Sequence, residues 1–321
     1  MDIFSNIFSY SIIHATIRMA TPILLASIAV IITQKAGVLN VGIEGIMTMG
    51  AFTAIVVSSQ TGSWLAAVLA AIAVGVFVAC IISVAHLKFK ADVFAVGMTI
   101  NIFAISLSIF LLNSMFGIRG SFRPEDLAPL PKLTIPFLQS NEVLNSIFNN
   151  YGLLEIGAIV MVFGLRFFLN RTSGGLRLKS VGLNEMAAET AGIHIDRTKF
   201  MALVFSGVIG GLAGAHLSLG YANFFISSMV SGRGFMGIAA MFFSGGNPVI
   251  SWLACLLFGF IDSTGSRLQA YGVPSEFVMM LPYITTIVVL SVSMWLRKRK
   301  SLLLASSVKT TGTHQLEDQK G

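Results

Sequence analysis

Charged residues are scarce in this chain. Only 11% of its 321 residues are Asp, Glu, Lys or Arg, whereas a soluble globular domain typically has about 25%. Hydrophobic residues make up 55%, and the mean hydropathy is +0.83. This balance excludes an ordinary soluble enzyme, a disordered regulator and a fibrous protein. It indicates a membrane protein with several spans, because each spanning helix needs about 20 apolar residues.

Cysteines and the common catalytic motifs are also scarce. Cys80 and Cys255 both lie inside apolar runs, so we expect them to pack as small hydrophobic residues, with no disulfide framework and no metal site. The sequence has no Gly-x-x-x-x-Gly-Lys-Ser/Thr phosphate loop, no His-Glu-x-x-His and no Gly-x-Ser-x-Gly. If ATP drives the protein, another chain must bind it, so no cofactor is expected here. The first basic residue is Arg18, and no cleavable signal peptide is predicted.

The net charge of +7 comes mainly from bases in short segments between apolar runs. This distribution is typical of a membrane protein oriented by its positive loops, and it does not indicate a nucleic-acid partner. Loop 170–199 contains five Lys and Arg residues, and residues 297–300 are all basic. Both segments are expected in the cytoplasm. Counting spans backwards from them places the N-terminus outside.

The hydrophobic runs predict an all-α fold, a polytopic transmembrane helical bundle of about 9–10 spans. We expect a single transmembrane domain over residues 1–300, which includes the cytoplasmic loop 170–199, and a polar cytoplasmic tail over residues 301–321. The expected spans are residues 8–32, 38–58, 64–85, 93–115, 153–169, 200–219, 235–243, 249–261 and 277–295.

Two segments of similar sequence suggest an inverted repeat. Residues 42–47 precede the Ser-Trp-Leu-Ala sequence at 63–66, and residues 237–242 precede the same four residues at 251–254. In the predicted topology the two units enter the bilayer from opposite sides, as the repeats of many transporters do. The run at 235–243 is short for a full crossing, so we expect a re-entrant or broken helix there.

Four polar side chains inside apolar runs are candidates for lining a substrate pathway: Asn40, Glu44, Asn101 and Asp262. Asn40 and Glu44 are four residues apart and share one face of a helix. A carboxylate at mid-depth in the bilayer costs roughly 2.5–3.5 kcal/mol and does not normally face lipid. Glu44 would therefore line the pathway or brace its wall. In the alternative interpretation it lies near the cytoplasmic interface and pairs with Lys35 or a base of the loop.

A glycine-rich run predicts tight helix packing in the span at 200–219. Its small residues recur at i, i+3, i+4 and i+7 and form one smooth stripe, made of Gly207, Gly210, Gly211 and Gly214. Other polar residues in apolar runs are expected to have structural roles. His14 and His216 would pack in the bundle, and Arg18 would pair with a carboxylate or extend to the interface.

The basic loop contains a short predicted helix from Asn184 to Ala191. Asn184 can cap its first turn, and Gly192 can end it. Ala187, Ala188 and Ala191 would give this helix a small, smooth face that fits a groove on a partner. The alternative is a surface helix without a partner.

At these residues the chain resembles the permeases of ABC importers of the branched-chain amino acid/ribose type, within the subgroup that serves nucleosides and simple sugars. The matching stretches follow the family's order and include Ala-Gly-Val-Leu-Asn-Val-Gly-Ile-Glu-Gly-Ile at 36–46. The others are residues 20–26, 182–192, 232–235 with 247–248, and 281–283. One departure is the glycine pair within 243–248, where bulkier residues are common in the family.

The resemblance implies a multi-pass permease of the cytoplasmic membrane that has no catalytic residues of its own. Its partners would be a second homologous permease, a tandem-domain ATPase that binds ATP and magnesium, and an extracellular substrate-binding lipoprotein, besides membrane lipid. The short helix of the basic loop would couple the permease to the ATPase. The residues expected to do so are Gly182, Asn184, Glu185, Ala187, Ala188, Ala191 and Gly192.

The function that follows is ATP-driven import of nucleosides, or of a related simple sugar, by alternating access. A second hypothesis is an ion-coupled secondary transporter, motivated by Glu44, Asp262 and the suggested repeat. A third is an intramembrane enzyme, for which the sequence offers no pair of catalytic residues.

Overall fold

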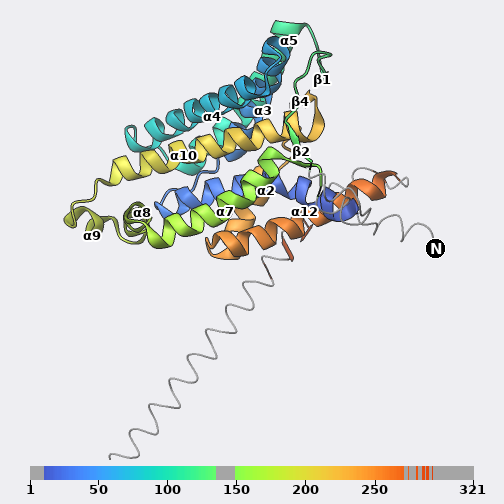
Figure 1. Cartoon of the computed structure of the whole chain (residues 1–321). Helices are drawn as coiled ribbons and strands as arrows, with labels where there is room; N and C mark the ends of the chain where they lie inside the picture. Colours follow the sequence, from blue (N-terminus) through green and yellow to red (C-terminus); the bar gives the residue numbers. More distant parts are fainter. Residues whose placement is uncertain are drawn as a thin grey trace, which may run out of the picture.

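The computed structural model describes residues 11–134 and 149–270, with a few single positions beyond them. The predicted span at 277–295 and the predicted tail at 301–321 lie outside these two ranges. Within them the chain is mostly helical, with only very short strands, which confirms the all-α fold (Figure 1). The α-helices are α2 (Ser11–Lys35), α3 (Ile43–Thr61), α4 (Trp64–Leu87), α5 (Val93–Phe116), α7 (Leu153–Arg171), α8 (Ser173–Leu183), α9 (Glu185–Thr190), α10 (Ile195–Ala215), α11 (Arg233–Ser244) and α12 (Pro248–Ala270).

Two small antiparallel strand pairs and one π-helix complete the described structure. Strand β1 (Ser121–Phe122) pairs with β4 (Phe225–Ile226), and β2 (Lys132–Leu133) pairs with β3 (Tyr151–Gly152). The π-helix η2 (His216–Ala222) continues α10 directly. All four strands lie at one end of the bundle, whereas α8 and α9 lie at the other (Figure 1).

Six described helices are long and apolar enough to cross a membrane, so the protein is a multi-pass membrane protein. They are α2, α4, α5, α7, α10 with η2, and α12. Two of the expected spans within the described ranges, those that form α3 and α11, are not among these six. Polar residues and glycines dilute the hydropathy of α3, and α11 has only 12 residues. A helix of that length is about 18 Å long, whereas the hydrocarbon core is about 30 Å thick.

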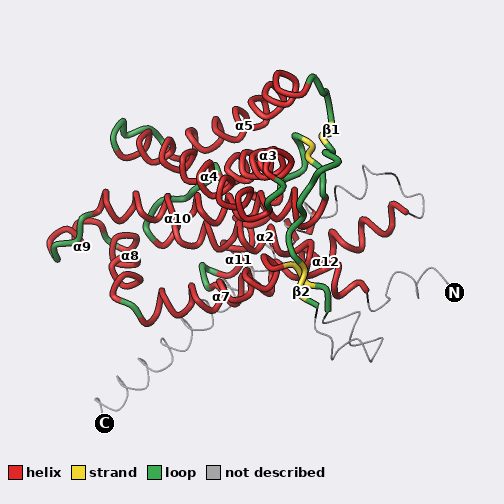
Figure 2. The backbone as a smooth tube through the Cα atoms, turned by 45° about the horizontal axis from the view of Figure 1, so that its top comes forward, coloured by secondary structure: helices red, strands yellow, loops and turns green. Residues whose placement is uncertain are grey.

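Helix α2 lies at the centre of the bundle, packed against α10, α11 and α12 (Figure 2). Its most apolar stretch is 72% buried, whereas those of α5 and α7 are only 28% buried. A helix that is apolar on all sides is stable inside the bundle, and helices with large exposed apolar faces are suited to lipid. The exposed apolar surfaces of α5 and α7 are therefore suited to the hydrocarbon core.

The chain direction agrees with the predicted topology. The ring of His14, near the start of α2, stacks on Tyr151 of β3 at the strand end of the bundle. Lys35, the last residue of α2, donates a hydrogen bond to the carbonyl of Gly245 near α8. The segment from β4 to Gly245 therefore runs from the strand end to the α8 end, as the predicted topology requires of the short apolar piece. If α8 and α9 are cytoplasmic, α2 begins on the outer side.

Candidate functional site

The first turns of two helices meet inside the bundle. Glu44 lies in the first turn of α3, and its carboxylate accepts hydrogen bonds from the backbone N–H groups of Gly232, at 2.7 Å, and Gly234, at 2.8 Å. These two groups belong to the start of α11, where the helix dipole carries partial positive charge. A carboxylate is a suitable ligand for such a helix end. Glu44 therefore acts as an internal anion that holds α11 in place.

This junction requires glycine at positions 232 and 234. Gly232 has a φ of +79°, a left-handed conformation that residues with a side chain rarely adopt. A Cβ atom added to Gly234 would lie 2.6 Å from a carboxylate oxygen of Glu44 and 3.0 Å from its Cα. The Gly-Arg-Gly sequence thus lets the backbone of α11 approach α3 closely.

Arg233, between those glycines, connects the same helix end to α12. Its guanidinium lies 2.8 Å from the carboxylate of Asp262, and both side chains are mostly buried. It also donates to the carbonyl of Met229 at 3.0 Å. The start of α11 is therefore fixed to α3 through Glu44 and to α12 through Arg233.

The two candidate asparagines brace the chain just before and at the start of α3. Asn101 accepts a hydrogen bond from the N–H of Gly45 at 2.7 Å and donates to the carbonyl of Val41 at 3.0 Å. Asn40 donates to the hydroxyl of Ser206 at 2.9 Å and accepts from the N–H of Gly42 at 3.1 Å. Both amides are buried.

The structure thus brings Asn40, Glu44 and Asn101 together around the start of α3, and links Asp262 to the same junction through Arg233. Each of the four has a protein partner, which favours the bracing role over direct contact with a solute. The alternative pairing of Glu44 with Lys35 is wrong, because the Lys35 ammonium group bonds to Gly245 and the Glu44 carboxylate bonds to α11. The suggested inverted repeat stays a prediction.

The glycines of α10 form two contact faces instead of one stripe. A Cβ atom on Gly207 or Gly211 would come within 2.5 Å of a backbone oxygen of α4, and one on Gly214 would lie 2.2 Å from the backbone oxygen of Met47 in α3. A Cβ atom on Gly210 would lie 2.7 Å from the side chain of Ile46. The helices α3, α4 and α10 therefore approach each other at distances that only glycine permits.

Helices α8 and α9 form the far end of the bundle (Figure 1). Asn184 caps α9 by accepting the N–H of Ala187 at 3.1 Å, and Glu185 forms a 2.7 Å ion pair with Lys199. A Cβ atom on Gly182 would lie 2.3 Å from the carbonyl oxygen of Lys35, so this glycine fits against the end of α2. Gly192 has a φ of +79° and follows the helix end.

The three alanines expected to form one face of α9 do not share a face. Ala187 and Ala191 are exposed, but Ala188 is turned into the chain and is only 2% exposed. The prominent exposed side chains are instead Leu183 and Met186, which are 86% and 80% exposed. These two residues were not predicted as exposed, although apolar side chains in an otherwise polar loop are a recognisable signal.

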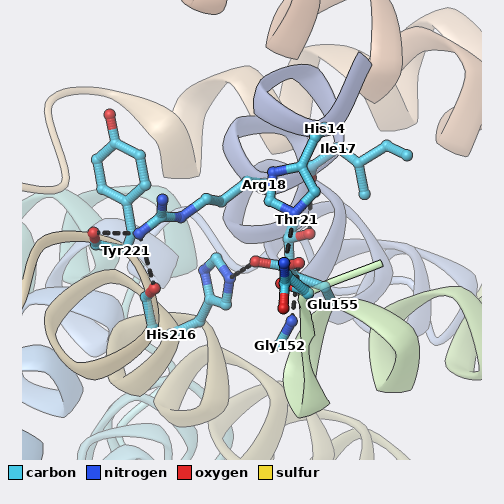
Figure 3. A network of polar contacts seen from close by, with 10 residues as sticks. His14, Ile17, Arg18, Thr21, Gly152, Glu155, His216 and Tyr221 are labelled. Atoms are coloured by element: carbon cyan, nitrogen blue, oxygen red, sulfur yellow. Dashed lines mark hydrogen bonds and ion pairs between the residues drawn. The ribbon is translucent and has the colours of Figure 1, made fainter. Parts of the chain in front are cut away.

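A partly buried polar network lies near the strand end of the bundle (Figure 3). Arg18 donates to the carbonyls of Gly220, at 3.1 Å, and Tyr221, at 2.7 Å, in η2. It therefore pairs with the backbone of η2 instead of with a carboxylate. The carboxylate of Glu155 accepts the N–H of Gly152 and lies 3.5 Å from the ring of His216.

The network connects α2, α7 and η2 through groups that the sequence analysis treated as packing residues or did not single out. Glu155 was not predicted, although a glutamate at the third position of a helix can accept the backbone N–H of the capping residue, as it does here from Gly152. Among the described residues, no group of three or more His, Cys, Asp or Glu side chains could hold a metal ion.

Comparison with known proteins identifies the family. The sequence model described as the permease component of branched-chain amino acid transport systems matches residues 12–290. The chain belongs to this permease family. A permease component of this kind is a translocating subunit and not itself the catalyst.

Individual relatives of this permease match along most of their length. The guanosine ABC transporter permease protein NupQ of Bacillus subtilis is 34% identical over 292 residues, which cover 87% of this chain and 91% of NupQ. The nucleoside ABC transporter permease protein NupC of Lactococcus lactis is 33% identical over 284 residues, covering 85% and 88%. A putative glucose ABC transporter permease protein of Haloferax volcanii, TsgC13, is 29% identical over 308 residues, covering 88% and 92%.

Proposed function

We propose that this permease is the membrane subunit of an ATP-driven ABC importer that carries nucleosides, or a related simple sugar, into the cell by alternating access. The observation that carries the proposal is the similarity to nucleoside permeases over nearly the whole of both chains. A sugar permease is similar over a comparable length, which supports a solute that contains a sugar.

The charge arrangement at the α3–α11 junction supports an uncharged solute. The positive end of α11 is already occupied by Glu44, and the nearby Arg233 is paired with Asp262. A pathway wall whose charges are paired internally offers no strong site for an anion or a cation. Nucleosides and simple sugars carry no net charge and are compatible with such a wall.

The same pairing removes the motive for an ion-coupled transporter. That hypothesis was motivated by two ionisable side chains that could bind a coupling ion. Glu44 and Asp262, which suggested it, both have strong partners within the protein.

The proposed assembly contains a second homologous permease, a tandem-domain ATPase and an extracellular substrate-binding lipoprotein. The absence of a phosphate loop from this sequence supports an ATPase on a separate chain, which would bind ATP and magnesium. Helix α9, with the exposed Leu183 and Met186 beside it, would contact that ATPase, since exposed apolar side chains at the end of a bundle are suited to a protein partner.

The test is uptake into proteoliposomes that contain this permease, a second permease and the ATPase, with binding protein added outside. Labelled guanosine, glucose and leucine are compared, each with ATP or a non-hydrolysable analogue inside. We expect guanosine or glucose uptake that needs ATP hydrolysis and withstands an ionophore. Uptake without the ATPase, or loss of uptake with the ionophore while ATP is present, would overturn the proposal.

A further inference from the structure

A cavity of about 560 Å³ opens at the α8–α9 end of the bundle. It lies between the last turns of α7, helix α8 and the first turns of α10, and it reaches Ile32 near the end of α2. None of the pathway candidates lines it. Its position at the ends of three helices that can span a membrane places it at the boundary between the hydrocarbon core and water.

The polar part of this cavity is positively charged. Arg177 of α8, Arg197 of α10 and His194 line it, and its lining contains no acidic residue. Asp196 is next to Arg197 in sequence but is not among the lining residues. No hydrogen bond or ion pair occupies either guanidinium in the described structure, and no side chain caps the start of α10 beside them. The cavity therefore presents cationic groups that lack a counter-charge.

The remaining wall is apolar and partly exposed on the outside of the bundle. Phe168 of α7 and Met201 and Phe205 of α10 line the cavity, and all three are at least one-third exposed. Arg197 and Phe205 are eight residues apart, which corresponds to about 12 Å along a helix. The cavity thus changes from cationic to apolar along the direction in which a lipid headgroup leads into its acyl chain.

We propose that this cavity binds an anionic phospholipid of the cytoplasmic leaflet, with the phosphate between Arg177 and Arg197 and an acyl chain along Met201 and Phe205. Basic pockets between helices on the cytoplasmic side are suited to anionic headgroups, and the positive-inside rule places this end in the cytoplasm. The apolar wall favours a lipid over a free anion, because a phosphate ion would leave that wall in contact with water.

A lipid bound here would also touch the connection to α9. Ala191 and Gly192, which follow the last turn of α9, line the same cavity. The bound lipid would therefore fix the position of α9 relative to α7 and α10. This inference does not depend on the identity of the transported solute, so it stands apart from the proposed function.

The experiment measures lipid retention by the full-length chain in detergent. The protein is incubated with phosphatidylglycerol or with phosphatidylcholine of the same acyl chains, and bound lipid is counted by native mass spectrometry. We expect preferential retention of phosphatidylglycerol. One arginine near an anionic surface contributes about 1 kcal/mol, or about fivefold in affinity, so Arg177→Gln with Arg197→Gln should weaken retention by about 25-fold.

Two further variants isolate the site. Arg171→Gln removes a base from the same loop but outside this cavity, and it should leave retention unchanged. Met201→Asp introduces a carboxylate on the exposed apolar wall without altering either arginine, and it should weaken retention as well. Thermal unfolding in phosphatidylcholine verifies that each variant is folded.

The proposal is overturned if the double arginine variant and Met201→Asp, both folded, retain phosphatidylglycerol like the wild type. Equal loss in Arg171→Gln would also overturn it, because it would indicate a general effect of loop charge. The last arm adds inorganic phosphate in excess. Displacement of the lipid by phosphate alone would identify a simple anion site instead of a lipid site.

Discussion

The carboxylate of Glu44 accepts the backbone N–H of Gly234 at 2.8 Å, across 190 positions of sequence. This contact joins the first turn of α3 to the first turn of α11 inside the bundle. Since it places a negative charge at the positive end of a short helix, it stabilises both the charge and the helix. Glu44 is only 7% exposed, so water cannot readily replace the bond.

Replacement of Glu44 should loosen α11. We expect Glu44→Ala to lower the free energy of unfolding by about 1–3 kcal/mol, because two backbone N–H groups lose a charged partner. Glu44→Gln keeps an acceptor oxygen and should cost less. Thermal unfolding in detergent and uptake in proteoliposomes measure the two effects. Glu125→Gln, in an exposed loop position, is the matched control. Wild-type stability in Glu44→Ala would show that the junction does not hold α11.

The glycines of α10 permit a test of close packing. Gly211→Ala should destabilise the protein by about 1–3 kcal/mol, since the added methyl group would lie 2.4 Å from the carbonyl oxygen of Ala71. Gly157→Ala in α7 is the control, because its Cβ atom would have no neighbour within 4 Å. That control should be neutral or stabilising, as alanine favours the helix by up to about 1 kcal/mol. Equal unfolding temperatures for the two variants would contradict the packing described.

The ion pair between Arg233 and Asp262 should behave as a coupled unit. Removing either side chain alone leaves the other mostly buried and without its charged partner. We expect Arg233→Met and Asp262→Leu to destabilise individually and to cost less together than the sum of their effects. A double-mutant cycle on unfolding stability should give a coupling of about 0.5–3 kcal/mol. Strict additivity would indicate that the pair does not contribute to holding α11 against α12.

Substitutions around α9 should separate partner binding from folding. Met186→Glu changes a side chain that is 80% exposed, so we expect loss of the ATPase from the purified complex without a change in unfolding temperature. Ala188→Glu instead places a carboxylate at a position that is 2% exposed, and it should destabilise the permease itself. Copurification with the ATPase and thermal unfolding distinguish the two. Retention of the ATPase by Met186→Glu would argue against α9 as the docking helix.

The helix boundaries could be predicted where the ends of an apolar run coincide with residues that cap or end helices. The expected spans at 64–85 and 93–115 lie within two residues of α4 and α5, which begin after the capping residues Ser63 and Asp92. The start of α3 was less accurate, since it was expected at 38 and occurs at Ile43. The side chain of Asn101 binds the carbonyl of Val41 and the N–H of Gly45, and Asn40 binds the N–H of Gly42. These hydrogen bonds hold residues 40–42 in an irregular conformation before α3. The hydropathy of the sequence does not reveal them.

The candidate site, too, could be predicted from the sequence only in part. The sequence identified Glu44, Asn101 and Asp262 as unusual, because ionisable and amide groups are rare in apolar runs. It did not identify Gly234 as the partner of Glu44 or Arg233 as the partner of Asp262. For α9 it placed the cap at Asn184 and the end near Gly192, but it did not predict that Ala188 turns inward, because that depends on how α9 rests on the rest of the chain.

The sequence by itself determined that this is an all-α membrane protein of the permease family and placed most of its helices. Hydropathy, helix length and short motifs are properties of contiguous residues, so they can be recognised before the chain folds. Only the tertiary structure decided that Glu44 holds the start of α11 and that Arg177 and Arg197 open onto one cavity with an apolar wall. Those relationships depend on which helix ends lie next to each other in the bundle. The packing of the whole chain determines this.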